Sequence, residues 1–91
     1  MSLALLFTPV SMTGAQYDEI IKRLQAAGAG SPPGRAYHVC FGSGPNMRVL
    51  DVFDSREQFD EFGKALMPIL QAVGVDPGHP DIAEVHNIII G

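Results

Sequence analysis

Hydrophobic residues in this chain follow two spacings, and the order in which the spacings alternate is what most restricts the fold. Short apolar or alternating runs typical of strands occupy residues 3–8, 35–42, 47–53 and 81–90. Between them, two longer stretches place apolar residues three and four positions apart, as one face of a helix requires. The order strand-helix-strand-strand-helix-strand is typical of a ferredoxin-like α+β fold with a four-stranded antiparallel sheet.

Local signals mark both ends of the first helix. Thr13 can cap its N-terminus, and Gln16 completes a capping box three residues later. Gly28 and Gly30, followed by a Ser-Pro-Pro-Gly segment, predict its end. The expected buried stripe consists of Tyr17, Ile20, Ile21, Leu24 and Ala27.

The second helix is predicted from the same kinds of signal. Asp54 or Ser55 is its expected cap, and Ser55 with Gln58 would form another capping box. Pro68 should kink or restart the helix, because proline removes a helical hydrogen bond, and Gly74 is the expected stop. The buried stripe would be Phe59, Phe62, Leu66, Ile69, Leu70 and Val73.

The two middle strands flank the turn-rich segment 43–46 and therefore predict a β-hairpin. If these four residues form the loop, His38 lies opposite Asp51 and Cys40 lies opposite Val49. A loop with an odd number of residues would shift the register by one position and separate His38 from Asp51.

The two faces of this hairpin differ in polarity. One would carry Tyr37, Val39, Phe41, Leu50 and Val52, and the other the more mixed set Ala36, His38, Cys40, Val49, Asp51 and Phe53. Right-handed crossovers place both helices on one face, and we expect them to cover the apolar one. The mixed face would then be covered by a second copy of the chain, giving a homodimer; the alternative is a monomer with a partly apolar open face.

Residues 48–59 carry a recognisable junction, in which an aromatic residue is followed by x-Ser-x-Glu-x-Phe, here from Phe53 to Phe59. This segment resembles the strand-to-helix junction of the dimeric α/β-barrel superfamily, and within it the small proteins grouped with antibiotic-biosynthesis monooxygenases. The resemblance implies one ferredoxin-like domain over residues 1–91, whose sheet packs against that of its mate, with a pocket in each protomer.

The sequence departs from two activities of that superfamily. Members that oxidise aromatic polyketides without a cofactor, and members that degrade haem, often use a tryptophan near the position of Phe53. Haem degraders also place an asparagine in the first strand and a histidine on the second helix. This chain has no tryptophan, an apolar first strand, and Phe59 and Phe62 on that helix. We therefore expect no haem chemistry and predict no cofactor.

His38 and Asp51 are the candidate catalytic residues, as a general base and the group that orients it. A structural hydrogen bond between two buried polar groups is the alternative interpretation. The expected ligand is a small apolar or aromatic molecule in a cavity beside the sheet, contacted by Tyr37, Cys40, Phe53 and His86. A cofactor-independent monooxygenase or isomerase, or a structural or partner-binding module without catalysis, are the competing functions.

Other functional classes lack their usual signals. His38, His86 and either Asp51 or Glu84 would supply metal ligands only if they shared one cavity, and no tight ligand spacing predicts a metal site. Cys40 on a strand is more typical of a buried apolar residue than of a nucleophile. The net charge of −4 and the scattered basic residues predict no nucleic-acid or membrane binding. With one cysteine and no signal peptide, the expected location is the cytoplasm.

Overall fold

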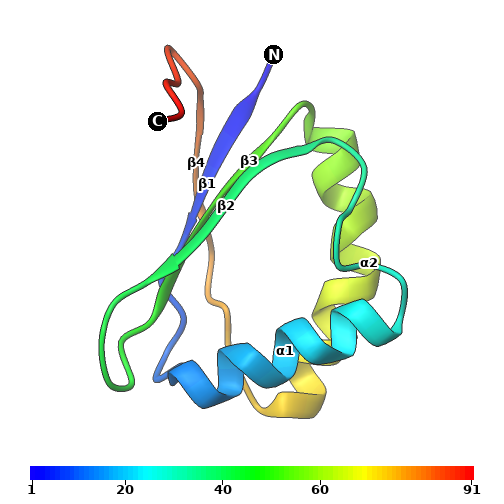
Figure 1. Ribbon diagram of the computed structural model, residues 1–91, viewed down its shortest axis with the longest axis vertical. Helices are drawn as coiled ribbons and strands as arrows, with labels where there is room; N and C mark the ends of the chain where they lie inside the picture. Colours follow the sequence, from blue (N-terminus) through cyan, green and yellow to red (C-terminus); the bar gives the residue numbers. More distant parts are fainter.

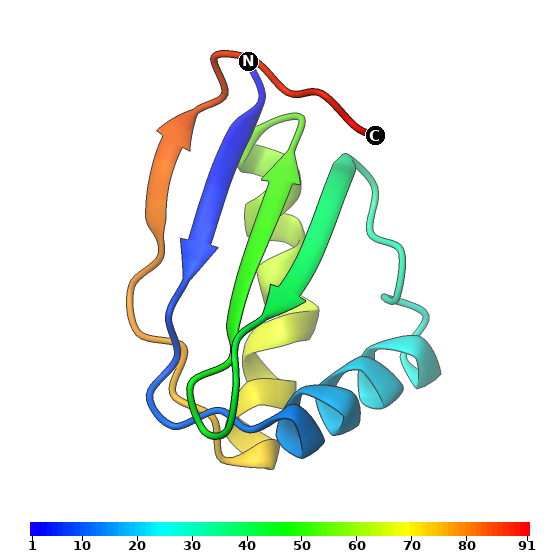
Figure 2. The same ribbon diagram turned by 60° about the vertical axis from the view of Figure 1, so that its left-hand side comes forward.

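Six elements form in the predicted order in a computed structural model that describes all residues, 1–91. They are β1 (Leu3–Phe7), α1 (Gly14–Ala26), β2 (Arg35–Phe41), β3 (Arg48–Phe53), α2 (Arg56–Val73) and β4 (Asp81–Glu84). The strands form one antiparallel sheet in the order β2-β3-β1-β4, so the apolar β1 is central, as predicted (Figure 2). Both helices lie on the same side of this sheet (Figure 1). Neither helix combines the length and the apolar composition needed to cross a membrane.

The helix boundaries follow from the predicted caps. Thr13 Oγ1 accepts the Gln16 backbone N–H at 3.1 Å, and Gln16 Oε1 accepts the Thr13 N–H at 2.9 Å, which confirms the capping box. Ser55 caps α2 by accepting the Gln58 N–H at 3.2 Å. Of the two outcomes expected at Pro68, a kink or a restart, the restart does not occur, because α2 is one continuous helix through this residue.

The hairpin has the register that the even-numbered loop predicts. His38 pairs with Asp51, and Cys40 pairs with Val49. The pairing is irregular only between Arg35 and Tyr37, at the far end of β2. The side chains of His38 and Asp51 therefore lie next to each other on one face of the sheet.

The prediction of which face the helices cover is wrong. They cover the mixed face: Phe53 is fully buried, and Leu5 of β1 on the same face is also 0% exposed. The Phe53 ring packs against Phe59 and Phe62 of α2, with ring centroids 5.4 and 5.7 Å away. Burial of the mixed face is possible because its two polar side chains satisfy each other's hydrogen bonds.

The other face of the sheet is the open one. Tyr37 and Phe41 on this face are 37% and 36% exposed, and Arg48 lies over the Phe41 ring, 4.7 Å from its centroid. The C-terminal segment turns back on this side, away from the helices (Figure 1). Exposed apolar side chains therefore lie on the face that was expected to be covered by the helices.

The last strand is shorter than predicted. It ends at Glu84, which pairs with Leu3, and the Val85 N–H then donates to the Ser2 carbonyl at 2.9 Å. Residues beyond Val85 have passed the first residues of β1 and have no strand left to pair with. Consequently His86 does not belong to a strand, and residues 88–90 are exposed outside the sheet.

Candidate functional site

A buried carboxylate lies at the centre of the site. Asp51, in the middle of β3, is 3% exposed and points toward the helices. Its Oδ1 lies 2.5 Å from Nδ1 of His38 on the neighbouring strand. A charge removed from water in this way is stable only when it is paired and hydrogen-bonded, and His38 supplies that bond.

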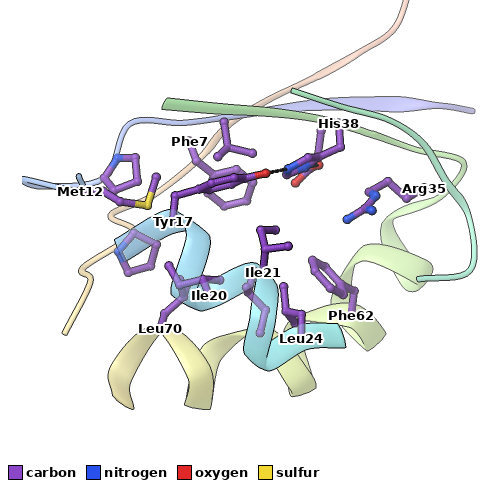
Figure 3. A pocket seen from close by; sticks show the side chains of 15 residues that line it. Phe7, Met12, Tyr17, Ile20, Ile21, Leu24, Arg35, His38, Phe62 and Leu70 are labelled. Carbon is purple, nitrogen blue, oxygen red and sulfur yellow. Dashed lines mark hydrogen bonds and ion pairs between the residues drawn. The ribbon is translucent and has the colours of Figure 1, made fainter. Parts of the chain in front are cut away.

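Tyr17 of α1 contacts the other ring nitrogen of His38. Its Oη lies 2.6 Å from His38 Nε2, and the two rings are stacked with an angle of 14° between their planes (Figure 3). Tyr17 stands in the first turns of α1, four residues after the Thr13 cap, and its N–H donates to the Thr13 carbonyl. The Thr13 cap that starts the helix therefore also fixes where the Tyr17 side chain lies relative to the sheet.

The three side chains form one hydrogen-bonded row, Asp51–His38–Tyr17, whose proton positions follow from their chemistry. A carboxylate can only accept, so His38 Nδ1–H donates to Asp51. In the neutral ring, Nε2 is then the acceptor and the Tyr17 hydroxyl donates to it. A proton taken up by the row would leave a positive charge on the imidazole, which the Asp51 carboxylate stabilises.

The surroundings keep two acidic groups near the row protonated. Burial raises the pKa of Tyr17, and the nearby Cys40 and Asp51 add to the rise, while Arg35 opposes it. Burial also raises the pKa of the Cys40 thiol, so it is a weak nucleophile at neutral pH. Tyr17 is therefore a neutral hydroxyl, and Cys40 is a thiol on the same strand face as His38.

A small cavity lies beside the row, between the sheet and the helices. Its volume is about 60 Å³, and most of its 15 lining residues are apolar. Figure 3 shows apolar side chains of both helices forming one side, among them Ile21, Leu24 and Phe62. The polar lining side chains are Tyr17, Arg35, His38 and Asp51. An apolar space with a few convergent polar groups is the usual composition of a small-molecule site.

The predicted site residues divide between two places. His38 and Asp51 meet, as the hairpin register predicted, and both line the cavity. Phe53 lies within the aromatic core, and Cys40 flanks the row; neither lines the cavity.

Tyr37 and His86 lie elsewhere, and the idea of one cavity shared by His38 and His86 is wrong. Tyr37 and His86 line a shallow depression on the open face of the sheet, together with Val52 and the C-terminal segment. The cause is the alternation of side chains along β2 and the early end of β4. No group of three or more His, Cys, Asp or Glu side chains is placed to share a metal ion.

Two polar residues of the cavity wall, Tyr17 and Arg35, were not among the predicted site residues. Tyr17 carried one available signal, because its hydroxyl is the only polar group in an otherwise apolar helical stripe. Arg35 carried none: it is the first residue of β2, and only the folded chain shows that its side chain reaches the cavity.

Known structures share this fold. SnoaB from Streptomyces nogalater, described as a cofactor-independent oxygenase, superposes with a TM-score of 0.62 at 16% identity, over 97% of this chain and 94% of that one. A candidate antibiotic biosynthesis monooxygenase from Caulobacter crescentus gives 0.61 at 18% identity, over 97% and 91%. A second one, from Chloroflexus aurantiacus, gives 0.58 at 19% identity, over 99% and 97%. No family model and no curated protein sequence matches the chain.

The chain therefore has the ferredoxin-like fold of the antibiotic-biosynthesis-monooxygenase proteins, as its junction motif predicted. At this level of identity the likeness concerns the fold. The activity has to be argued from the cavity and the row beside it.

The raised pKa of Tyr17 gives a prediction about alkaline stability. The unfolded chain releases the Tyr17 proton near the ordinary value of 10.0 and the folded chain only at higher pH, so stability should fall as pH rises above that value. Unfolding free energies measured from neutral to alkaline pH should fall less steeply for Tyr17→Phe than for the parent chain. Tyrosinate absorbance of Tyr37→Phe, which retains only Tyr17, reports the same pKa directly. Titration of this variant at or below the ordinary value would contradict the prediction.

Proposed function

We propose that this chain binds a small apolar or aromatic molecule in the cavity beside the Asp51–His38–Tyr17 row. The observation that carries the proposal is the position of that row. Its three polar side chains are hydrogen-bonded to one another, and all three line an apolar cavity, with the Tyr17 hydroxyl at one end of the row. If the row served only stability, core side chains could pack directly against it and leave no cavity. Here the apolar lining gives affinity and the polar groups give orientation.

The cavity volume restricts the size of the ligand. About 60 Å³ is less than half of the roughly 150 Å³ that accommodates benzene in an engineered protein cavity. A ring can enter only if lining side chains move, and Met12, with its unbranched and flexible chain, is suited to that. We therefore propose a monocyclic ligand and not a fused polycyclic one.

A second candidate function is cofactor-independent catalysis by proton removal. With Asp51 holding Nδ1–H, the lone pair of His38 Nε2 is directed toward Tyr17. A bound carbon acid could pass a proton to Nε2, either by displacing the Tyr17 hydroxyl or through it. The resulting anion is reprotonated elsewhere in an isomerase, or reacts with dioxygen in an oxygenase. The description of SnoaB as a cofactor-independent oxygenase supports keeping this candidate.

We further propose that two copies associate through the open face of the sheet. Tyr37, Phe41 and Leu50 lie on this face, and the exposed Ile88 and Ile89 line a depression there together with Tyr37 and Leu50. A contiguous apolar surface of this kind is uncommon on a monomer. The argument for a dimer thus remains, but the dimer would form through the opposite face of the sheet from the one first expected.

If the cavity takes no ligand, this surface would instead support the role of a structural or partner-binding module. The single unpaired Cys40 fits a reducing location such as the cytoplasm.

The ligand proposal predicts that filling the cavity abolishes binding. A library of monocyclic aromatic compounds should contain members that raise the melting temperature of the parent chain. Ile21→Trp, which adds a large ring in the cavity, should lose that shift, whereas Met67→Trp on the exposed side of α2 should keep it. Equal shifts in both variants would place binding outside the cavity, and the absence of any shift in the parent would contradict the proposal.

The catalytic candidate predicts hydrogen exchange on a bound carbon acid. For a library ligand with a C–H next to a carbonyl, the parent chain in D₂O should speed deuterium incorporation, followed by NMR. His38→Gln should reduce that rate at least roughly a hundredfold while ligand binding is retained, because a general base is lost. His86→Gln, on the other face, is the matched control. Exchange that is unchanged in His38→Gln would eliminate this candidate.

The dimer proposal predicts a mass of two chains. Light scattering should give twice the 9.8 kDa of one chain, and Phe41→Glu should give a single chain because it places a charge in the apolar surface. Met67→Glu on α2 controls for the added charge and should remain dimeric. A parent chain that scatters as a monomer at high concentration would refute the dimer and leave the cavity proposal intact.

A further inference from the structure

Arg35 is the one arginine or lysine in the cavity wall. It begins the edge strand β2, and Figure 3 shows its guanidinium directed into the cavity, between His38 and Phe62. The wall beside it is mostly apolar. Arg35 is half-buried, so water compensates part of its charge, and the part inside the cavity depends on an opposite charge or on hydrogen-bond acceptors.

The chain itself provides little of that compensation. One Arg35 N–H, on Nη2, donates to the Gly30 carbonyl at 2.9 Å, and Arg35 takes part in none of the four ion pairs of the chain. Asp51 is the only carboxylate in the cavity wall, and it is bonded to His38. Arg35 therefore has several N–H donors free beside the cavity.

The remaining polar groups of the wall add hydrogen-bonding capacity and no second anion. The Tyr17 hydroxyl keeps its proton because burial raises its pKa. A ligand in the cavity thus meets a guanidinium fork and a neutral hydroxyl together with an apolar surface. Planar guanidinium groups bind carboxylates with two parallel hydrogen bonds, which favours a carboxylate over a single anionic oxygen.

We propose that the ligand is a monocyclic aromatic or aliphatic carboxylic acid whose carboxylate binds to Arg35. The proposal rests on the proposed function, since it specifies the chemistry of a molecule in the same cavity. The ring would occupy the apolar part near Ile21 and Phe62, and the carboxylate would lie at the Arg35 end. This arrangement assigns Arg35 the role of selecting anions, separate from the proton-handling row.

The test compares benzoate with benzamide, two probes of nearly the same shape that differ in charge. Binding of each is measured by NMR titration at neutral pH. The parent chain should bind benzoate roughly tenfold more tightly than benzamide, as expected for one charge-assisted pair. R35M should reduce that preference to about twofold or less and weaken benzoate binding more than benzamide binding, because no charge remains to discriminate between the probes.

Two further variants keep the result interpretable. Because Arg35 also binds the Gly30 carbonyl, R35K is measured beside R35M; it retains a cation and should retain part of the preference for benzoate. R48M removes a basic residue on the open face, beside Phe41, and should bind both probes as the parent does.

Each outcome has a distinct meaning. If benzamide binds the parent chain as tightly as benzoate, or if R35M keeps the full preference, the role of Arg35 is refuted while the cavity remains a ligand site. If neither probe binds and the aromatic library also gives no shift, the proposed function fails and this proposal fails with it. If library members bind but neither probe does, only the carboxylate proposal is refuted.

Discussion

The buried carboxylate of Asp51 is the constraint on which the rest of the site depends. It is almost inaccessible to water, so it requires a partner within the fold, and His38 on the adjacent strand is that partner. A shift of the hairpin by one residue would move His38 to the opposite face and leave the carboxylate without its bond. The register of β2 against β3 and the integrity of the row are therefore a single requirement.

The same requirement explains why a polar pair can face the helices. Near it, the Phe53 ring packs edge to face against Phe59 and at a tilt against Phe62. On the helix side, the Tyr17 hydroxyl forms a hydrogen bond with Nε2, the second ring nitrogen of His38. The polar groups are thus satisfied within an apolar environment, and a small cavity lies beside them.

The elements, their caps and the hairpin register could be predicted because each depends on residues close in sequence. The capping box at Thr13 and the even-numbered loop before Met47 are of this kind. The covered face could not be predicted by counting apolar residues, since that count ignored how well His38 and Asp51 satisfy each other. The end of β4 depends on where its partner β1 begins, which is information from another part of the chain. Arg35 likewise joins the site only through the tertiary structure.

The most direct test of this account is the protonation of the His38 ring. In a chain carrying His79→Gln and His86→Gln, His38 is the only histidine, and long-range ¹H–¹⁵N correlations then report its two nitrogens separately. The account predicts a proton held on Nδ1 by Asp51, with Nε2 as the hydrogen-bond acceptor in the neutral ring. A neutral ring with its proton on Nε2, or two tautomers in rapid exchange as in free histidine, would contradict it.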